Sequence, residues 1–89
     1  MGHSTSTPRS QAQIRAWLTS RVAHYLQLTE ADIDVDVPLN RYGLDSIYAV
    51  ALCGEIEDAL DVYVEPTLVW DVPTVSGLSE HLSALVSAR

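Results

Sequence analysis

The 89-residue sequence is short of several features, and each shortage excludes a class of protein. Cysteine occurs once, at Cys53, which excludes an internal disulfide framework and indicates a reducing, cytoplasmic setting. Lysine is absent, and five arginines stand against 12 acidic residues, for a net charge of −7. This charge disfavours nucleic acid and anionic membranes, and no apolar run approaches the roughly 20 residues of a membrane span. The charge either serves a protein partner with a basic patch or only keeps the surface soluble.

The sequence also lacks the spacings of known catalytic and metal sites. The run GLDSI at residues 43–47 departs from the G-x-S-x-G pattern around an activated serine. His24 and His81 stand in predicted helices with no relation to this run, and they are expected at the surface. One cysteine with scattered histidines gives no metal-ligand spacing, and a glycine-rich phosphate loop is missing. We therefore predict that the protein is not an enzyme.

What the sequence does contain suits one small globular domain. Hydrophobic residues make up 47% and charged residues 19%, and because phenylalanine is absent, aliphatic side chains must supply most of the core. The polar opening stretch MGHSTSTPRS, residues 1–10, is expected to be a disordered tag or linker, and residues 11–88 the domain. A chain this short stabilises a helical bundle more easily than a large sheet, so we predict an all-α fold.

Apolar residues at helical spacing predict three longer helices. The first is expected over residues 11–28, where the S-Q-A-Q stretch at residues 10–13 can form a capping box. The second is expected over residues 46–60. The last is expected over residues 75–88, with Thr74 as its cap.

Two segments join these helices. The stretch TEADIDVDVPLNRYG alternates apolar residues with aspartates, which alone would suggest a strand, but the chain offers no second strand to pair with it. We predict a long ordered loop that packs Ile33, Val35 and Leu39 onto the helices. The EPTLVWD stretch predicts a short third helix with Pro66 at its first position. Trp70 is expected to anchor this short helix in the core.

The second predicted helix is apolar on two sides. On a wheel of about 100° per residue, one side forms a core stripe of Ala49, Leu52, Cys53, Ile56, Ala59 and Leu60. The other side adjoins Ser46 and carries Ile47, Val50, Ala51 and Gly54, with acidic residues around them. An apolar patch ringed by carboxylates is typical of a docking surface; the alternative is a helix buried on both sides. Gly54, which costs a helix about 1 kcal/mol relative to alanine, leaves a notch for a partner or lets the loop approach.

Ser46 follows a glycine turn at the start of this helix. Its simplest interpretation is a helix N-cap. A serine in this place also suits a phosphate group, because the first-turn N–H groups and the positive end of the helix dipole favour an anion. Conversion to a phosphodiester would cost the fold little, and Asp45 beside it could help a modifying enzyme position a metal ion or a basic residue.

The stretch GLDSIYAVAL resembles the D-S-L attachment motif of acyl carrier proteins and related carrier domains, with Ile47 in place of the usual leucine. DVDVPLNRYGLDS and VEPTLVWDVPTVSGLSEHL are similar to the flanking segments of such domains, so that the likeness covers roughly residues 11–87. It is strongest to carrier domains of bacterial type I polyketide synthases. The resemblance implies a four-helix bundle with a long first loop and a short third helix, carrying 4′-phosphopantetheine on Ser46.

Such a domain holds acyl intermediates as thioesters on the arm and presents them to enzymes. The resemblance implies that the recognition positions of carrier domains are matched here by Asp45, Ile47, Val50, Gly54, Glu57 and Asp58. The expected partners are a phosphopantetheinyl transferase and ketosynthase, acyltransferase or acyl-activating ligase domains. The isolated domain is expected to be a monomer. Cys53, on the core stripe, is expected to be buried and inert.

Three alternatives stay open at this point. The first is a peptidyl or aryl carrier domain of a nonribosomal peptide synthetase, although Asp45 favours acyl over aminoacyl cargo. The second is a helical interaction module that is never modified and uses Ser46 only as a cap. The third and weakest is a small hydrolase with Ser46 as its nucleophile.

Overall fold

Four α-helices and two 3₁₀ turns make up residues 8–88, the part of the chain that the computed structural model describes. The helices are α1 (Gln11–Leu26), α2 (Ser46–Leu60), α3 (Leu68–Asp71) and α4 (Val75–Ser87), and the 3₁₀ turns are η1 (Glu30–Asp32) and η2 (Leu39–Tyr42). The predicted all-α bundle with a short third helix is confirmed. Most of the expected tag, residues 1–7, lies outside the described residues.

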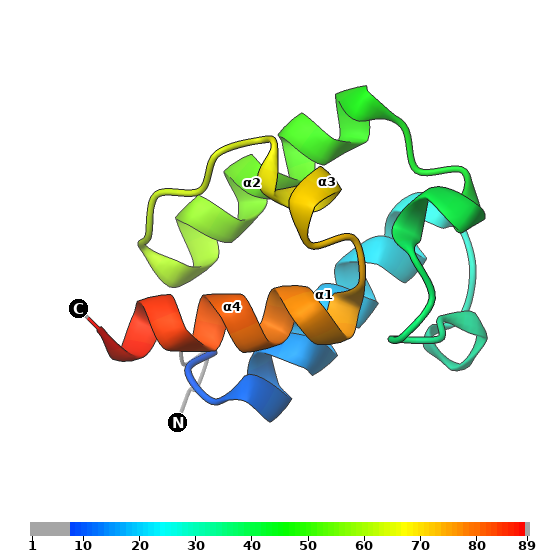
Figure 1. The fold of residues 1–89 in the computed structure, drawn as a ribbon. Helices are drawn as coiled ribbons and strands as arrows, with labels where there is room; N and C mark the ends of the chain where they lie inside the picture. Colours follow the sequence, from blue (N-terminus) through cyan, green and yellow to red (C-terminus); the bar gives the residue numbers. More distant parts are fainter. Residues whose placement is uncertain (1–7, 89) are drawn as a thin grey trace.

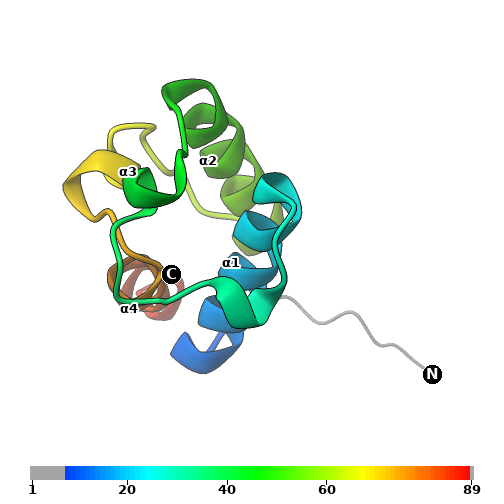
Figure 2. The same ribbon diagram turned by 90° about the vertical axis from the view of Figure 1, so that its right-hand side faces the viewer.

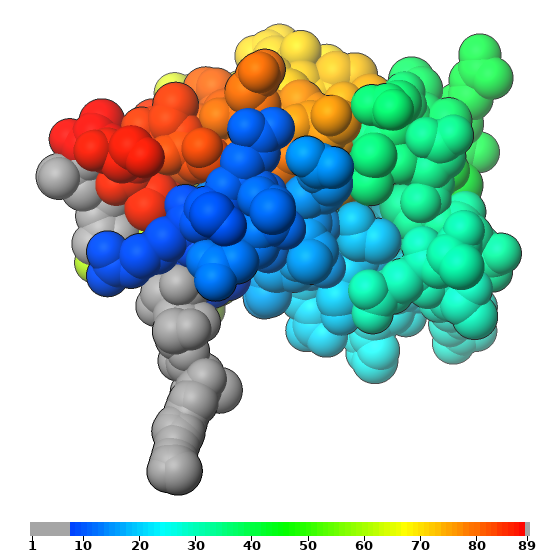
Figure 3. All heavy atoms as spheres, turned by 90° about the horizontal axis from the view of Figure 1, so that it is seen from below, coloured from blue at the N-terminus to red at the C-terminus, as the bar shows by residue number. Residues whose placement is uncertain are grey.

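The helices surround one aliphatic core. Seen nearly end-on, they follow one another around it in the order α1, α2, α3, α4 (Figure 2). α3 sits between α2 and α4 (Figure 1), and α1 packs along α4 with the loop before α2 at one end of the pair (Figure 3). The largest fully buried side chains are Ile14, Leu18, Leu39, Leu52, Ile56, Leu60, Leu78 and Leu82. Within the described range, no helix is long and apolar enough to cross a membrane.

α1 begins where the sequence predicts and ends earlier. The Gln13 N–H donates to Ser10 Oγ at 3.1 Å, and the Ser10 N–H donates to Gln13 Oε1 at 3.2 Å, which is the predicted capping box. The helix stops at Leu26, two residues before the predicted end. Gln27 adopts a left-handed conformation (φ 59°) and turns its N–H back to the last carbonyls of the helix. No glycine marks this ending in the sequence.

The segment from Gln27 to Asp45 is the predicted ordered loop. Ile33 and Leu39 are buried and Val35 is half-buried, as expected. The alternating pattern gave no sign of the two 3₁₀ turns within the loop. Two backbone hydrogen bonds of 2.8 Å tie the loop to the start of α4, from Leu39 N to Pro73 O and from Ser76 N to Val35 O. The loop therefore enters α2 from a fixed position.

The short third helix corrects two expectations. It begins at Leu68, with Thr67 as its cap, so Pro66 is not its first helical residue. Its single turn buries Val69, while Trp70 remains 45% exposed. The expectation that Trp70 anchors the helix in the core is wrong, because one helical turn presents only one of these neighbouring side chains to the core. α4 starts as predicted, with Thr74 Oγ1 accepting the Gly77 N–H at 3.0 Å.

Candidate functional site

Each residue of the G-L-D-S run has a separate structural task at the start of α2. Gly43 has a φ of 83°, which glycine adopts without strain. Leu44 is buried and fixes the turn to the core. Asp45 is the N-cap, and its Oδ1 accepts the Tyr48 N–H at 2.8 Å. The interpretation of Ser46 as the N-cap is therefore wrong, since Ser46 is the first helical residue.

The Ser46 side chain is left free by this arrangement. It is exposed, and among the described residues no hydrogen bond occupies its hydroxyl. The N–H groups of Ser46 and Ile47 are likewise without an acceptor in that part of the chain, because the cap takes Tyr48 and the first helical carbonyl bond goes to Ala49. A free hydroxyl thus stands beside two free N–H donors at the positive end of a 15-residue helix. This geometry suits a phosphodiester on Ser46.

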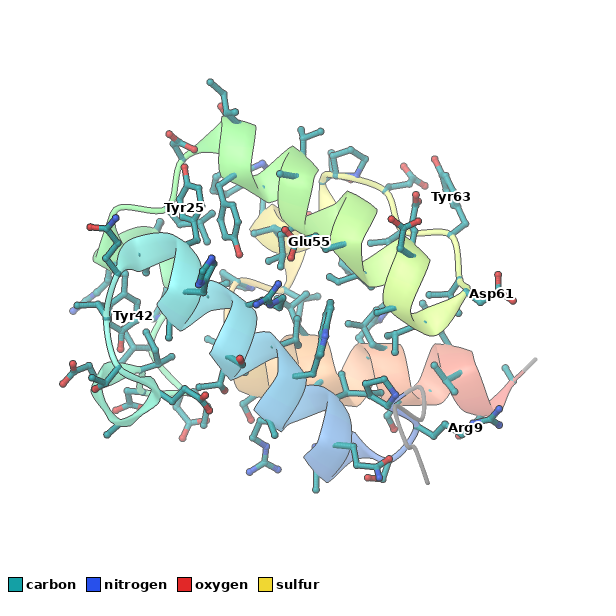
Figure 4. All side chains as sticks on the ribbon, turned by 180° about the vertical axis from the view of Figure 1, so that it is seen from behind. Arg9, Tyr25, Tyr42, Glu55, Asp61 and Tyr63 are labelled. Carbon is teal, nitrogen blue, oxygen red and sulfur yellow. The ribbon has the colours of Figure 1, made fainter. Side chains whose placement is uncertain are left out.

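Tyr48 secures the first turns of α2 to α1. The residue is 3% exposed, and its ring stacks on Tyr25, with ring centroids 3.6 Å apart and planes 12° from parallel. Its hydroxyl donates to the carbonyl of Arg21 at 3.1 Å. Tyr25 lies beside the start of α2 in Figure 4. The core stripe as predicted did not include Tyr48, although it lies one turn before Leu52 and the helical period could have found it.

Burial raises the pKa of the Tyr48 phenol above its ordinary value of about 10, and the negative charge of Glu55 adds to the effect. The folded state therefore holds this proton at a pH where the unfolded chain releases it. We expect the free energy of unfolding to be unaffected by this group below pH 10 and to fall above it, by up to about 1.4 kcal/mol per pH unit.

The measurement is urea unfolding from pH 8 to 11.5. Tyr48→Phe should flatten the alkaline fall and lower stability at pH 8 by about 1 kcal/mol, since it loses the bond to Arg21. Tyr63→Phe is the matched control, because that ring is 76% exposed. Equal alkaline slopes for Tyr48→Phe and the wild type would refute the assignment.

The outer face of α2 consists of Ile47, Val50, Ala51 and Gly54, and it is open to solvent. Ile47 is 78% exposed and Val50 is 56% exposed. A helix buried on both sides is therefore excluded as the explanation of the second apolar patch. A Cβ atom added at Gly54 would meet nothing within 4 Å, so the loop does not approach there either. The fold itself gives no reason for glycine at this position.

Comparison with protein families identifies this arrangement. The model of the family described as "Phosphopantetheine attachment site" matches residues 16–82, which include the whole of α2 and the residues around Ser46. The chain belongs to this family of carrier domains. Members carry 4′-phosphopantetheine on a serine and are not catalysts themselves.

Curated relatives are long proteins of which this carrier domain spans a small part. It is 42% identical over 76 residues, 80% of the chain, to 6-methylsalicylic acid synthase of Aspergillus terreus. It is 37% identical over 82 residues, 88% of the chain, to 6-methylsalicylic acid synthase of Penicillium patulum. A phenolphthiocerol/phthiocerol polyketide synthase of Mycobacterium tuberculosis is 31% identical over 80 residues, 90% of the chain. The carrier domain covers only 4–5% of the length of these three proteins.

Solved structures place the fold among carrier proteins of both acyl and peptidyl type. Acyl carrier protein LipD from Actinoplanes friuliensis is 42% identical, with a TM-score of 0.76, and the match covers 99% of this chain and 100% of that one. A free-standing peptidyl carrier protein from Acinetobacter baumannii is 36% identical, with a TM-score of 0.84, covering 88% and 98%. The fold alone therefore does not separate the two kinds of cargo.

The carboxylates along α2 differ in their exposure to solvent and in their hydrogen bonds. Asp58 is exposed, whereas Glu57 is half-buried and its Oε2 accepts the Val64 N–H at 2.9 Å. The resemblance predicts that Glu57 meets partners, and in the structure its hydrogen bond holds the segment after α2 in place. Glu55 points from α2 toward α1 (Figure 4), and its Oε1 is the one buried side-chain oxygen without a partner in the described range.

The single cysteine of the carrier domain is sequestered, as predicted. Cys53 is 2% exposed, and its thiol donates to the carbonyl of Glu65 with Sγ and O 3.6 Å apart. Burial raises the pKa of the Cys53 thiol, and the charge of Glu57 raises it further. Because thiolates are the reactive form, Cys53 is protected twice from thiol reagents.

Proposed function

We propose that this domain, residues 11–88, is an acyl carrier of a polyketide synthase and that Ser46 is its attachment point for 4′-phosphopantetheine. The observation that carries the proposal is the exposed Ser46 hydroxyl, free of hydrogen bonds in the described residues, beside the two free N–H groups of Ser46 and Ile47. When bound, the arm supplies a thiol on which acyl groups are held as thioesters.

Ser46 supplies the nucleophile for attachment. Its Oγ bonds to the pantetheine-bearing phosphorus of coenzyme A, losing its proton, and adenosine 3′,5′-bisphosphate leaves. The N–H groups of Ser46 and Ile47 can then donate to the phosphodiester oxygens, which the helix dipole also favours. Asp45 stays engaged as the N-cap through Oδ1, and the cap leaves its other oxygen available to a metal ion or a basic group of the modifying transferase.

Polyketide cargo is favoured over peptidyl cargo by the relatives. The relative from Mycobacterium tuberculosis is by name part of a polyketide synthase, and the match covers 90% of this chain. The partners we propose are a cytoplasmic phosphopantetheinyl transferase and the ketosynthase, acyltransferase or acyl-activating ligase domains of the parent synthase. A peptidyl carrier stays the second candidate because of the match to a free-standing peptidyl carrier protein.

The test is intact mass after incubation with coenzyme A, Mg²⁺ and a broad-specificity phosphopantetheinyl transferase. We expect the mass of one phosphopantetheine to be added, with fragmentation placing it on Ser46. Thiol titration of the native protein should rise from none to one, because Cys53 is buried and only the arm is accessible. No addition, with the transferase active on another carrier, would leave only an unmodified interaction module. Loading with acyl or aminoacyl groups then separates the two kinds of carrier.

The outer face of α2 is proposed to meet the partner enzymes through Ile47, Val50 and Gly54, with Asp58 beside them. Ile47→Asp should lower kcat/KM for arm attachment by the transferase about tenfold, because it removes a central apolar contact. The fold should be unaffected, since Ile47 is 78% exposed. Leu28→Asp is the matched control, an exposed leucine of the loop after α1. Equal rates for the two variants would remove Ile47 from the docking surface.

A further inference from the structure

A second concave site lies away from Ser46. A pocket of about 310 Å³ opens between the segment after α2, α3 and α4, and we call it the α3–α4 pocket. The residues of its lining that matter here are Tyr63, Glu65, Leu68, Asp71, His81 and Leu85. None of them belongs to the outer face of α2. Tyr63 lies at the opposite end of α2 from Tyr25, which marks the Ser46 end (Figure 4).

The lining combines apolar side chains with an aromatic ring and two carboxylates. Leu68 and Leu85 are half-buried and supply apolar surface. Tyr63 leaves 76% of its surface exposed, which is unusual for a residue of its size. Glu65 and Asp71 are exposed, and their carboxylates take part in no hydrogen bond or ion pair with another described residue. The pocket therefore offers negative charge and apolar surface that the domain itself does not use.

The surrounding charge is uniformly negative. From residue 43 to residue 88 the sequence contains eight aspartates and glutamates and no arginine or lysine. All four described arginines lie between residues 9 and 41. The lining contains no lysine and no arginine. A cation is thus the complement that this pocket lacks, and anionic ligands such as nucleic acid are repelled.

We propose that the α3–α4 pocket receives an arginine side chain of a partner protein, independently of the arm on Ser46. The aliphatic stem of arginine can lie on Leu68 and Leu85. Its planar guanidinium can stack on Tyr63 and present N–H groups to Glu65 and Asp71. A lysine matches the charge but not the planar stacking or the forked hydrogen bonds. Such a contact gives the partner a second hold on the domain, apart from the outer face of α2.

The test is an NMR titration of the unmodified full chain at constant ionic strength with capped arginine (N-acetyl-arginine methylamide). We expect saturable shifts of backbone amides confined to residues 63–71 and 81–85, with a dissociation constant on the order of 10 mM, as befits two exposed ionic contacts and one cation–π contact. Capped citrulline, which has the same shape without the charge, should give shifts at least about fivefold smaller.

Two double variants with the same change in net charge distinguish binding in the pocket from general electrostatic attraction to the negatively charged domain. Glu65→Gln with Asp71→Asn should weaken arginine binding about tenfold. Glu30→Gln with Glu80→Gln, both exposed and outside the pocket, should leave it unchanged. All four side chains are on the surface, and the spectra report directly whether each variant is folded. Tyr63→Leu should weaken binding about threefold through loss of the stacking.

Three results would overturn the proposal. Citrulline could shift the same amides as strongly as arginine, or the shifts could spread along α2 without saturating, or the Glu65/Asp71 variant could bind like the wild type. If the domain dimerises and capped arginine dissociates the dimer, the occupant is a second copy of this chain and not another protein. None of these measurements depends on modification of Ser46. They therefore test the pocket independently of the proposed carrier function.

Discussion

Alanine in place of Ser46 should abolish attachment of phosphopantetheine and leave the fold intact. The loss should be complete, because Ser46 Oγ is the atom that forms the phosphodiester in the proposed reaction. The free energy of unfolding should change by less than about 0.5 kcal/mol. Ser46 is exposed and its hydroxyl makes no hydrogen bond to a described residue, while the cap of α2 is the neighbouring Asp45.

The combination of results is what makes this prediction specific. If Ser46 were the N-cap, alanine would cost about 1 kcal/mol, so urea unfolding of Ser46→Ala separates a structural role from a chemical one. Ser87→Ala, at the exposed end of α4, is the matched control and should be modified at the wild-type rate. Modification of Ser46→Ala at any other residue, located by fragmentation, would move the attachment site elsewhere.

The faces of α2 could be read from the sequence because a helical period fixes which residues share a side. Leu52, Ile56 and Leu60 are all fully buried as the wheel predicts, and Ile47 and Val50 are exposed opposite them. The wheel alone left the outer face ambiguous between a docking surface and a second buried side. Only the placement of the other helices decided this, since no described residue packs over that face.

The register at the start of α2 could not be read in the same way. Asp45 and Ser46 are both good N-cap residues, and the sequence places them side by side. The choice between them depends on Leu44, which is only 4% exposed and so fixes the chain one residue before the cap. Burial of that leucine is a tertiary contact, and local propensity carries no information about it.

Tertiary contacts also explain the other features that the sequence did not predict. Glu57 was expected only at the partner surface, yet it accepts the N–H of Val64, seven residues later, because the chain folds back after α2. Trp70 was expected inside and lies 45% exposed, because Val69 takes the buried place of the single turn. The α3–α4 pocket joins residues from Tyr63 to Leu85 and has no signature in any one stretch of sequence.

Leu52→Ala should lower the free energy of unfolding by about 2–5 kcal/mol, the largest effect on stability that we predict. Leu52 is fully buried at the centre of α2 and belongs to the core shared by the four helices. A domain of this size has only about 5–15 kcal/mol in total. The variant should therefore unfold at a lower temperature and at a lower urea concentration than the wild type. Within its unfolding range, attachment at Ser46 should fall with the folded fraction, because the free helix start exists only when α2 is docked.

Val50→Ala, two residues earlier on the outer face, is the matched control for Leu52→Ala. Val50 is 56% exposed, so its truncation should change stability by less than about 0.5 kcal/mol. Urea unfolding of both variants measures the contrast, and arm attachment below the melting range of Leu52→Ala should recover to the wild-type rate. A cost below about 1 kcal/mol for Leu52→Ala, or equal costs for the two, would mean that the buried and exposed faces of α2 are misassigned. The docking role of Ile47 and Val50 would fail with that assignment, since both faces are set by the same helical rotation.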